Sequence, residues 1–389
     1  MRKPRICLIS HIYLERRHRS KLSYLAQDVE LDLVSPDRFE SPYGLQRADF
    51  AGIADYRVRV YPCWFPLGVR TSTRWLLASH DLGLRASPPD ILHVENEVHS
   101  LSLLQAVLYQ RHYAPRARVV VSVWANQRLR GAIGFGLNLL ARLLRPGIDA
   151  YISGNTDGKA LLIESGVLPE RIAVFPLVGV DTDHYRPVSA EERARLRKQL
   201  GIPLDAFVIG YVGRFVNDKG LPDLLAALEF LRSEPDGVST RLLCVGNGPL
   251  KPSLHRRAPE VIVASPGGGK VLPYYQVLDV IVLPSRTMPN WKEQFGRALV
   301  EAMACGVPVV GSSSGAIPEV IGEGGKVFPE GNVAEMQTIL LQLRHSEAVR
   351  RQLGERGLRR VHDLYSEQQI ARQTYDVYCK AAGPGARRS

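Results

Sequence analysis

Two carboxylates in the second half of the chain, Glu293 and Glu301, lie eight positions apart between two apolar runs. The runs at 280–283 and 307–311 predict buried strands of a parallel sheet, and residues 295–304 have the apolar spacing of a helix. Eight helical residues rise about 12 Å, so the two acids could hold opposite ends of an extended ligand. The first amides of such a helix attract phosphate. For Glu301 the alternative is a surface or helix-dipole carboxylate.

Two cations follow the strand-like run at 207–212. Arg214 and Lys219 are placed just beyond its end. A guanidinium binds phosphate oxygens as a fork and an ammonium binds them as a point charge, so this pair suits a diphosphate. At about 4 Å in a partly screened site, each would contribute roughly 4 kcal/mol of gross attraction before desolvation. The alternative for the same residues is a solvated turn.

Two glycines, Gly246 and Gly248, follow the next strand-like run, at 241–245. Glycine allows the backbone to approach a flat or charged ligand closely, but glycines also form ordinary turns. Ligands of parallel sheets bind beyond the carboxyl ends of the strands, which is where all these residues lie.

Strand-like runs alternate with helix-length stretches along the chain, as is typical of parallel βα units. In the first half the runs lie at 6–10, 29–34, 56–61, 91–94, 119–123, 150–152 and 172–175. In the second half they lie at 207–212, 241–245, 261–264, 280–283, 307–311 and 326–328.

This alternation predicts an α/β protein with two doubly wound, Rossmann-like domains that face a central cleft. The 389 residues, 45% of them apolar, suffice for two such domains. We expect a first domain at 1–186 and a second at 187–365. A final helix at about 366–382 is expected to pack back on the first domain.

The composition argues against several classes of protein. The sequence has no apolar run of about 18 residues and no secretory leader pattern, so we expect a cytoplasmic protein. Five cysteines without paired spacing predict small buried residues and neither a disulfide framework nor a zinc site. The net charge of +11 favours anionic ligands or lipid head groups. It is the only feature that favours nucleic acid, since the sequence shows no recognisable nucleic-acid-binding module.

The stretch from Arg128 to Arg145 mixes arginines with leucines, and residues 111–145 contain no acidic residue. A core helix rimmed with arginines is the first expectation for this composition. The alternative is an interfacial helix that contacts an anionic membrane. The protein would then be a peripheral protein at the inner face of the membrane.

In their order along the chain, these features resemble the retaining sugar-nucleotide glycosyltransferases of family 4. The resemblance covers about residues 176–365, and the Glu-x7-Glu spacing is its most diagnostic part. It is carried by Gly213-Arg214, Lys219-Gly220, Gly246-Asn247-Gly248-Pro249, Pro284-Ser285, Glu293-x7-Glu301 and Ala304-Cys305-Gly306-Val307-Pro308-Val309-Val310. The resemblance implies the GT-B fold, with a nucleoside diphosphate sugar held mainly by the second domain.

The resemblance also implies three catalytic residues. Arg214 and Lys219 would neutralise the departing diphosphate, and Glu293 would bind hydroxyls of the donor sugar without acting as a nucleophile. The expected reaction is a front-face substitution in which the departing phosphate helps to deprotonate the acceptor. No cofactor or metal is then required. Asp181-Thr182-Asp183 looks like an Asp-x-Asp metal motif, but its position is similar to the family's Gly-Val-Asp linker.

Further donor contacts follow from the same resemblance. Phe295 and Gly296 would present backbone amides to the sugar and the phosphate, and Glu301 would bind the ribose. Gln294 replaces a frequent proline of the family and is expected to touch the sugar. The remaining expected contacts are Gly213, Gly246, Gly248, Ala264, Arg297 and Leu299.

The first half resembles the family less closely. The segment 10–14 lacks the glycines that many members have after the first strand, and Trp124-Ala125-Asn126-Gln127 stands where many have a histidine. The acceptor-side candidates are therefore His11, His93, Glu95, Trp124 and Asn126, with His99 as a further alternative. For each histidine, a structural role is the competing interpretation.

The resulting hypothesis is a hexosyltransferase that moves a sugar from a UDP- or GDP-sugar to the hydroxyl or amine of a small-molecule or lipid-linked acceptor. The alternative is a non-catalytic sugar-nucleotide-binding subunit of a glycosyltransferase complex. The presence of Arg214, Lys219 and Glu293 favours the enzyme. Turnover of donor by the purified protein separates the two.

Overall fold

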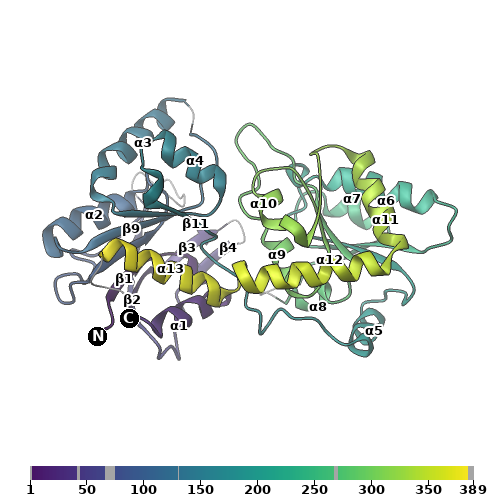
Figure 1. The fold of residues 1–389 in the computed structure, drawn as a ribbon, viewed down its shortest axis with the longest axis horizontal. Helices are drawn as coiled ribbons and strands as arrows, with labels where there is room; N and C mark the ends of the chain where they lie inside the picture. The colour runs from purple at the N-terminus through teal and green to yellow at the C-terminus, as the bar shows by residue number, and fades with distance from the viewer. Residues whose placement is uncertain (1, 42–43, 66–74, 130, 267–269, 384–389) are drawn as a thin grey trace. The chain divides into compact units, whose positions relative to one another are not determined.

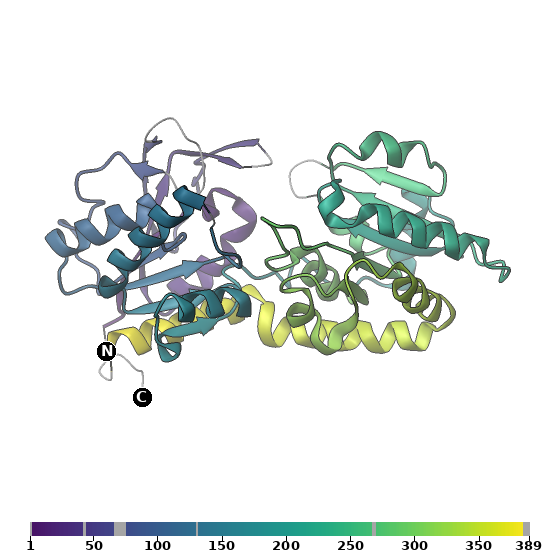
Figure 2. The ribbon, with the colours of Figure 1, turned by 90° about the horizontal axis from the view of Figure 1, so that it is seen from above.

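The structure is a computed structural model that describes residues 2–41, 44–65, 75–129, 131–266 and 270–383. The chain divides into two compact units. Unit 1 consists of Met1–Gly179 and Glu367–Ser389, and unit 2 consists of Val180–Ser366. Figures 1 and 2 show helices on both faces of the sheet in each unit.

Unit 1 contains a seven-stranded sheet with the order β11-β10-β9-β8-β1-β2-β5, in which all neighbouring strands are parallel. Its strands are β1 (Arg5–Ile9), β2 (Glu30–Pro36), β5 (Arg57–Tyr61), β8 (Ile91–Glu95), β9 (Arg118–Val123), β10 (Ala150–Ser153) and β11 (Ile172–Val174). Two short antiparallel pairs lie outside this sheet, β3 (Arg38–Ser41) with β4 (Gly44–Arg47) and β6 (Cys63–Trp64) with β7 (Leu76–Leu77). They were not predicted, because such short strands show too little alternation.

The helices of unit 1 cover both faces of this sheet. They are α1 (Ser20–Ala26), α2 (Leu101–Tyr113), α3 (Gly131–Leu144), α4 (Thr156–Glu164) and α13 (Glu367–Ala382). Helix α13, drawn in yellow in Figure 1, packs against α1, and Ile370 and Tyr378 share a buried cluster with Leu22 and Leu25. The end of the chain thus completes the core of unit 1.

Helix α3 differs from our first expectation of a core helix. Its buried residues are Gly134 and Leu144, whereas Phe135 and Leu143 are 73% and 66% exposed. The arginine-and-leucine composition was compatible with either a core or a surface helix, and the structure shows a surface helix.

Unit 2 contains a six-stranded parallel sheet with the order β14-β13-β12-β15-β16-β17. The strands are β12 (Phe207–Val212), β13 (Thr240–Val245), β14 (Val261–Ala264), β15 (Val280–Leu283), β16 (Val309–Ser312) and β17 (Gly325–Phe328). The helices are α5 (Ala190–Gln199), α6 (Leu221–Ser233), α7 (Lys251–His255), α8 (Leu272–Tyr275), α9 (Arg297–Ala304), α10 (Ile317–Ile321), α11 (Val333–His345) and α12 (Glu347–Arg360).

Both sheets have the doubly wound order, and the predicted fold class of two Rossmann-like sheets is confirmed. The strand order reverses between β12 and β15 in unit 2, and between β1 and β8 in unit 1. At such a switch point the loops after the two central strands diverge, which leaves room for a ligand beyond the carboxyl ends. The residues that follow these four strands are therefore the first candidates for a site.

Candidate functional site

Lys219, Ser285 and Glu293 form a nearly buried polar cluster at the switch point of unit 2. Lys219 ends the turn after β12, and Ser285 follows β15 by one intervening proline. Lys219 Nζ donates to Glu293 Oε2 at 2.6 Å, and Ser285 Oγ donates to the same oxygen at 2.9 Å. The Lys219 and Glu293 side chains are 13% and 10% exposed. Two residues predicted from separate motifs therefore meet as an ion pair.

Two glycines allow the loops of this cluster to approach one another. Gly220 has a φ of +70°, and a Cβ there would lie 1.8 Å from the carbonyl oxygen of Pro284. Gly315 has a φ of +54°, and its Cβ would lie 2.1 Å from the carbonyl oxygen of Glu293. Because left-handed φ and contact with backbone coincide at both positions, only glycine fits without movement.

Trp291 lies beside the same cluster, in contact with Lys219. Its ring centroid lies 4.4 Å from Lys219 Nζ, a distance at which the ring face attracts a cation. The ammonium of Lys219 thus has both a carboxylate and an aromatic neighbour.

Glu301 belongs to a second buried network, on α9. Arg297 Nε donates to Glu301 Oε1 at 2.6 Å, and the Tyr275 hydroxyl donates to Oε2 at 2.7 Å. Burial, with the nearby Glu301 charge, raises the pKa of Tyr275 well above its ordinary value, so the hydroxyl keeps its proton and donates. Glu301 is 5% exposed, which contradicts the alternative of a surface carboxylate.

The helix that separates the two acids is shorter than predicted. Helix α9 begins at Arg297 rather than at Phe295, because Gly296 has a φ of +77° and stands before the first helical residue. Glu293 therefore lies in the preceding loop, and the estimate of a helical rise between Glu293 and Glu301 does not apply.

Arg214 is more accessible than Lys219. Its side chain is 41% exposed and lies 3.7 Å from the carboxylate of Asp218, while its carbonyl accepts a hydrogen bond of 2.6 Å from Tyr211. An exposed guanidinium beside β12 can reach a ligand at the carboxyl edge without first losing a buried partner.

Gly246 and Gly248 have a structural explanation. A Cβ on Gly246 would lie 1.9 Å from the Gly213 carbonyl oxygen, and one on Gly248 would lie 2.6 Å from that of Phe215. The loop after β13 thus packs on the loop after β12. Ala264 accepts a hydrogen bond of 2.9 Å from the Gly246 amide, which joins β14 to the same edge.

The residues around the start of α9 differ in what they can present to a ligand. Gln294 is exposed, whereas Phe295 is 7% exposed and lies 5.8 Å from the Tyr365 ring. Leu299 has a fully buried side chain, and its amide donates to the Gly296 carbonyl at 2.8 Å. Leu299 thus has neither an exposed side chain nor an unpaired amide to present to a donor.

At the switch point of unit 1, Glu95 is held in a buried network. Lys21 Nζ donates to Glu95 Oε1 at 2.9 Å and to the Leu177 carbonyl at 2.7 Å, and the Tyr13 hydroxyl donates to Glu95 Oε1 at 2.9 Å. Burial is the largest single influence and raises the pKa of Glu95, but Lys21, His93 and Ser10 together outweigh it, and the net pKa lies below the ordinary value. Glu95 is thus an ionised core residue whose partners belong to unit 1.

His93 is also a core residue. Its Nδ1 lies 2.7 Å from the Tyr378 hydroxyl and its Nε2 lies 2.7 Å from Ser122 Oγ. Burial lowers the pKa of His93 to about 4, so the ring is neutral near pH 7. With no exposed surface and both nitrogens paired, His93 is not proposed as a base for an acceptor.

Three other acceptor-side candidates follow the strand ends of unit 1. His11, after β1, lies against Phe39 with ring centroids 4.2 Å apart and the ring planes tilted by 34°, and burial lowers the pKa of His11 to about 4. Trp124, after β9, lies so close to Gly154 that a Cβ there would be 2.3 Å from its ring, and Asn126 is 6% exposed. His99, the further alternative, is 8% exposed.

Glu97 was not assigned a role from the sequence. Its Oε1 accepts hydrogen bonds from the amides of Trp124 and Ala125, both at 3.0 Å. Burial raises the pKa of Glu97 to about 7, against the effect of the two amides. Its position along the chain could have indicated this contact. Strands β8 and β9 are parallel and Glu95 lies opposite Ser122. Two residues beyond these positions, Glu97 therefore faces Trp124.

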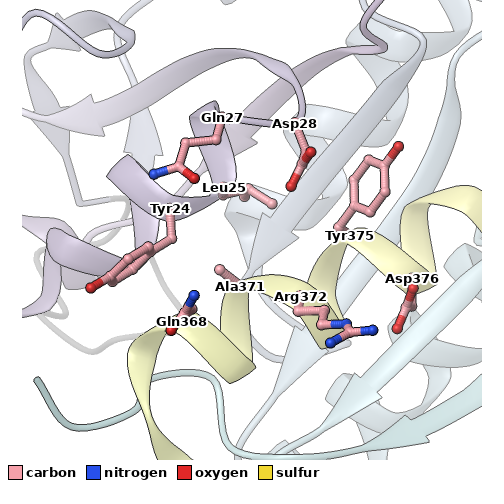
Figure 3. A pocket seen from close by; sticks show the side chains of 9 residues that line it. All are labelled: Tyr24, Leu25, Gln27, Asp28, Gln368, Ala371, Arg372, Tyr375 and Asp376. Carbon is pink, nitrogen blue, oxygen red and sulfur yellow. The ribbon is translucent and has the colours of Figure 1, made fainter. Parts of the chain in front are cut away.

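Across the described ranges, no group of three or more His, Cys, Asp or Glu side chains is placed to hold a metal ion. Asp181 Oδ1 instead accepts the amides of Asp183 and His184 at 3.0 and 3.1 Å. A cavity of about 360 Å³ lies in unit 1, and Figure 3 shows the side chains that line it. It is lined by residues of α1 and α13 and their flanks, among them Tyr24, Asp28, Arg372 and Tyr375, and by none of the predicted site residues.

Part of the chain matches a known protein family. Residues 206–346 match the family described as Glycosyl transferases group 1. The chain is 31% identical over 265 residues to the MMP alpha-(1->4)-mannosyltransferase of Mycolicibacterium hassiacum, covering 66% of this chain and 60% of that protein. It is 34% identical over 184 residues to a D-inositol 3-phosphate glycosyltransferase of Acidothermus cellulolyticus, covering 43% of this chain and 39% of that protein. The chain thus spans less than two thirds of the length of these curated relatives.

Solved structures match over almost the whole chain. The sucrose-phosphate synthase of Thermosynechococcus elongatus aligns with a TM-score of 0.69 and 20% identity, covering 97% of this chain and 98% of that one. Anabaena Alr3699/HepE in complex with UDP and glucose aligns with a TM-score of 0.65 and 18% identity, covering 96% and 98%. At this identity the likeness concerns the fold, which is the GT-B fold with two Rossmann-like sheets.

Proposed function

We propose that this protein is a retaining glycosyltransferase that moves a sugar from a UDP- or GDP-sugar to the hydroxyl or amine of an acceptor. The observation that carries the proposal is the Lys219–Glu293 pair at the switch point of unit 2. It lies within the residues that match Glycosyl transferases group 1. Its cation suits a diphosphate and its carboxylate suits sugar hydroxyls.

The donor would exchange partners with this pair. Phosphate oxygens would take the place of the Glu293 carboxylate on Lys219, and hydroxyls of the sugar would donate to the carboxylate so released. Arg214, which is already 41% exposed, would add a second positive charge. The nucleoside would extend toward Glu301, whose carboxylate would accept a hydrogen bond from the ribose.

The reaction on this account is a front-face substitution. The bond from the anomeric carbon to the diphosphate breaks, and the acceptor oxygen or nitrogen forms its bond on the same face. The acceptor proton passes to the departing phosphate oxygen. Lys219 and Arg214 stabilise the charge that develops on the diphosphate, and this type of stabilisation is usually the largest single contribution of an enzyme.

On the acceptor side we propose Trp124 and Asn126, with Glu97 holding the segment that carries them. Two hydrogen bonds of 3.0 Å from Trp124 and Ala125 to Glu97 support this assignment. The names of the relatives suggest the first acceptors to test. They include D-inositol 3-phosphate glycosyltransferases and an N-acetyl-alpha-D-glucosaminyl L-malate synthase of Bacillus anthracis.

The experiment is a panel of UDP- and GDP-sugars, first by thermal shift and then by transfer to D-inositol 3-phosphate, L-malate and simple sugars. We expect one base to be preferred and the product to keep the anomeric configuration of the donor, as read from proton couplings in NMR spectra. An inverted product would contradict the retaining assignment. Donor binding without release of nucleoside diphosphate would favour the alternative, a non-catalytic subunit.

A further inference from the structure

Helix α3 of unit 1 presents an apolar stripe to solvent. Phe135, Leu139 and Leu143 follow one another at intervals of four residues and are 73%, 49% and 66% exposed. Side chains spaced by four residues lie on one face of a helix. Gly134 and Leu144, which are buried, lie on the opposite face, and Leu144 belongs to a buried apolar cluster of unit 1. A stripe of large exposed apolar side chains on one helix indicates an interaction surface.

The charge around this stripe is positive. Arg142 is exposed and lies on α3 itself, and residues 111–145 contain no acidic residue. Arg128, which precedes the helix, pairs with Glu164 of α4, so its charge is largely compensated. The surface therefore combines apolar side chains with a cation, Arg142, that forms no ion pair with another described residue. The partner should combine an apolar interior with negative charge at its surface.

We propose that the outward face of α3 lies in the head-group region of an anionic lipid bilayer, with Phe135, Leu139 and Leu143 inserted and Arg142 at the phosphate level. The 14 residues of α3 correspond to about 21 Å of helix, less than the about 30 Å of a hydrocarbon core. In the described part of the chain no helix is long and apolar enough to cross a membrane. The helix would therefore lie in the plane of the interface.

Lipid fits this surface better than a second copy of the chain does. A symmetric dimer through α3 would bring the same arginine-bearing surface of two chains together, each with a net charge of +11, and like charges across an interface oppose association. An anionic bilayer instead supplies a negative surface potential for Arg142, whose aliphatic stem can reach along the inserted apolar side chains. Neither Arg142 nor any of the three apolar side chains is proposed to contact the donor or the acceptor, so the membrane contact does not depend on the proposed transfer reaction.

The test is co-sedimentation of the whole chain with vesicles of equimolar phosphatidylglycerol and phosphatidylcholine, compared with vesicles of phosphatidylcholine alone. We expect binding to the anionic vesicles that weakens in high salt. Leu139→Ser should lower the partition coefficient roughly fivefold, and Phe135→Ser roughly tenfold. Arg142→Glu should lower it roughly tenfold on anionic vesicles only.

Matched controls separate this surface from general stickiness and charge. Leu108→Ser changes a leucine of α2 that is 52% exposed, close to the 49% of Leu139, and should leave binding unchanged. Arg256→Glu changes the net charge as Arg142→Glu does, but in unit 2. The proposal would be overturned if the control variants lost as much vesicle binding as the α3 variants, or if the wild type did not bind anionic vesicles. A dimer in light scattering that Phe135→Ser dissociates would also overturn it, in favour of a protein interface.

Discussion

Replacing Lys219 by methionine removes the cation of the buried pair while keeping most of the side-chain volume. At the 2.6 Å separation of Lys219 and Glu293, the gross attraction is about 6 kcal/mol at an effective dielectric constant of about 20. Much of this is offset by desolvation, but the variant leaves a buried carboxylate that has lost its cation and still accepts a hydrogen bond from Ser285. We therefore expect Lys219→Met to lower the free energy of unfolding by about 3 kcal/mol.

The assay is urea unfolding followed by circular dichroism, in a double-mutant cycle with Glu293→Gln. Because the double variant leaves no uncompensated charge, it should lose about 2 kcal/mol less than the sum of the single losses. Arg232→Met is the control, since its pair with Glu260 is 42% and 26% exposed and should contribute less than about 1 kcal/mol. Additive losses, or a loss for Lys219→Met no larger than for Arg232→Met, would refute the argument from burial.

Three further outcomes follow from the described contacts. Gly315→Ala should displace the Glu293 backbone and weaken nucleotide-sugar binding, as measured by calorimetry, because its Cβ would lie 2.1 Å from the Glu293 carbonyl oxygen. Tyr275→Phe removes the hydroxyl that donates to Glu301 and should cost about 1 kcal/mol of stability. It should weaken the binding of UDP more than that of diphosphate, and equal weakening would contradict the role of Glu301 in binding the ribose. Burial raises the pKa of Glu97 from 4.5 to about 7, so the folded state retains a proton that the unfolded state has lost. As the pH rises from 4.5 to about 7, the free energy of unfolding of the wild type should therefore fall by about 3 kcal/mol relative to that of Glu97→Gln. Parallel pH profiles of the two proteins would contradict the raised pKa.

The sheets were predictable because a strand buried on both faces must be an apolar run. The run at 207–212 coincides with β12, and that at 280–283 coincides with β15. Helix α9 was predicted two residues too long at its start, because apolar periodicity does not reveal that Gly296 adopts a left-handed φ of +77°. The position of a helix depends on periodicity, whereas its first residue depends on one backbone angle.

The site was predictable in its members but not in its contacts. Motif resemblance indicated Lys219 and Glu293, yet their ion pair joins residues 74 positions apart, and no local pattern contains it. Glu95 has the same relation to Lys21, also 74 positions away. Whether such a carboxylate is free for a ligand or occupied by the core depends on tertiary packing. Glu95 was expected in a ligand site, and the structure adds that Lys21 and Tyr13 donate to its carboxylate.

The surface of α3 shows the same limit for apolar residues. Leucines at 139 and 143 could equally have faced the core, since spacing gives the face of a helix but not the direction in which that face points. Their exposed fractions of 49% and 66% settle the direction.

The central claim, that Lys219 and Glu293 hold the donor, is tested most directly by donor turnover. Release of nucleoside diphosphate from the preferred nucleotide sugar should be measured for the purified wild type and for Glu293→Ala, with thermal unfolding to show that the variant is folded. We predict turnover by the wild type and a loss of at least about hundredfold in the variant. Full activity of a folded Glu293→Ala variant would contradict the account.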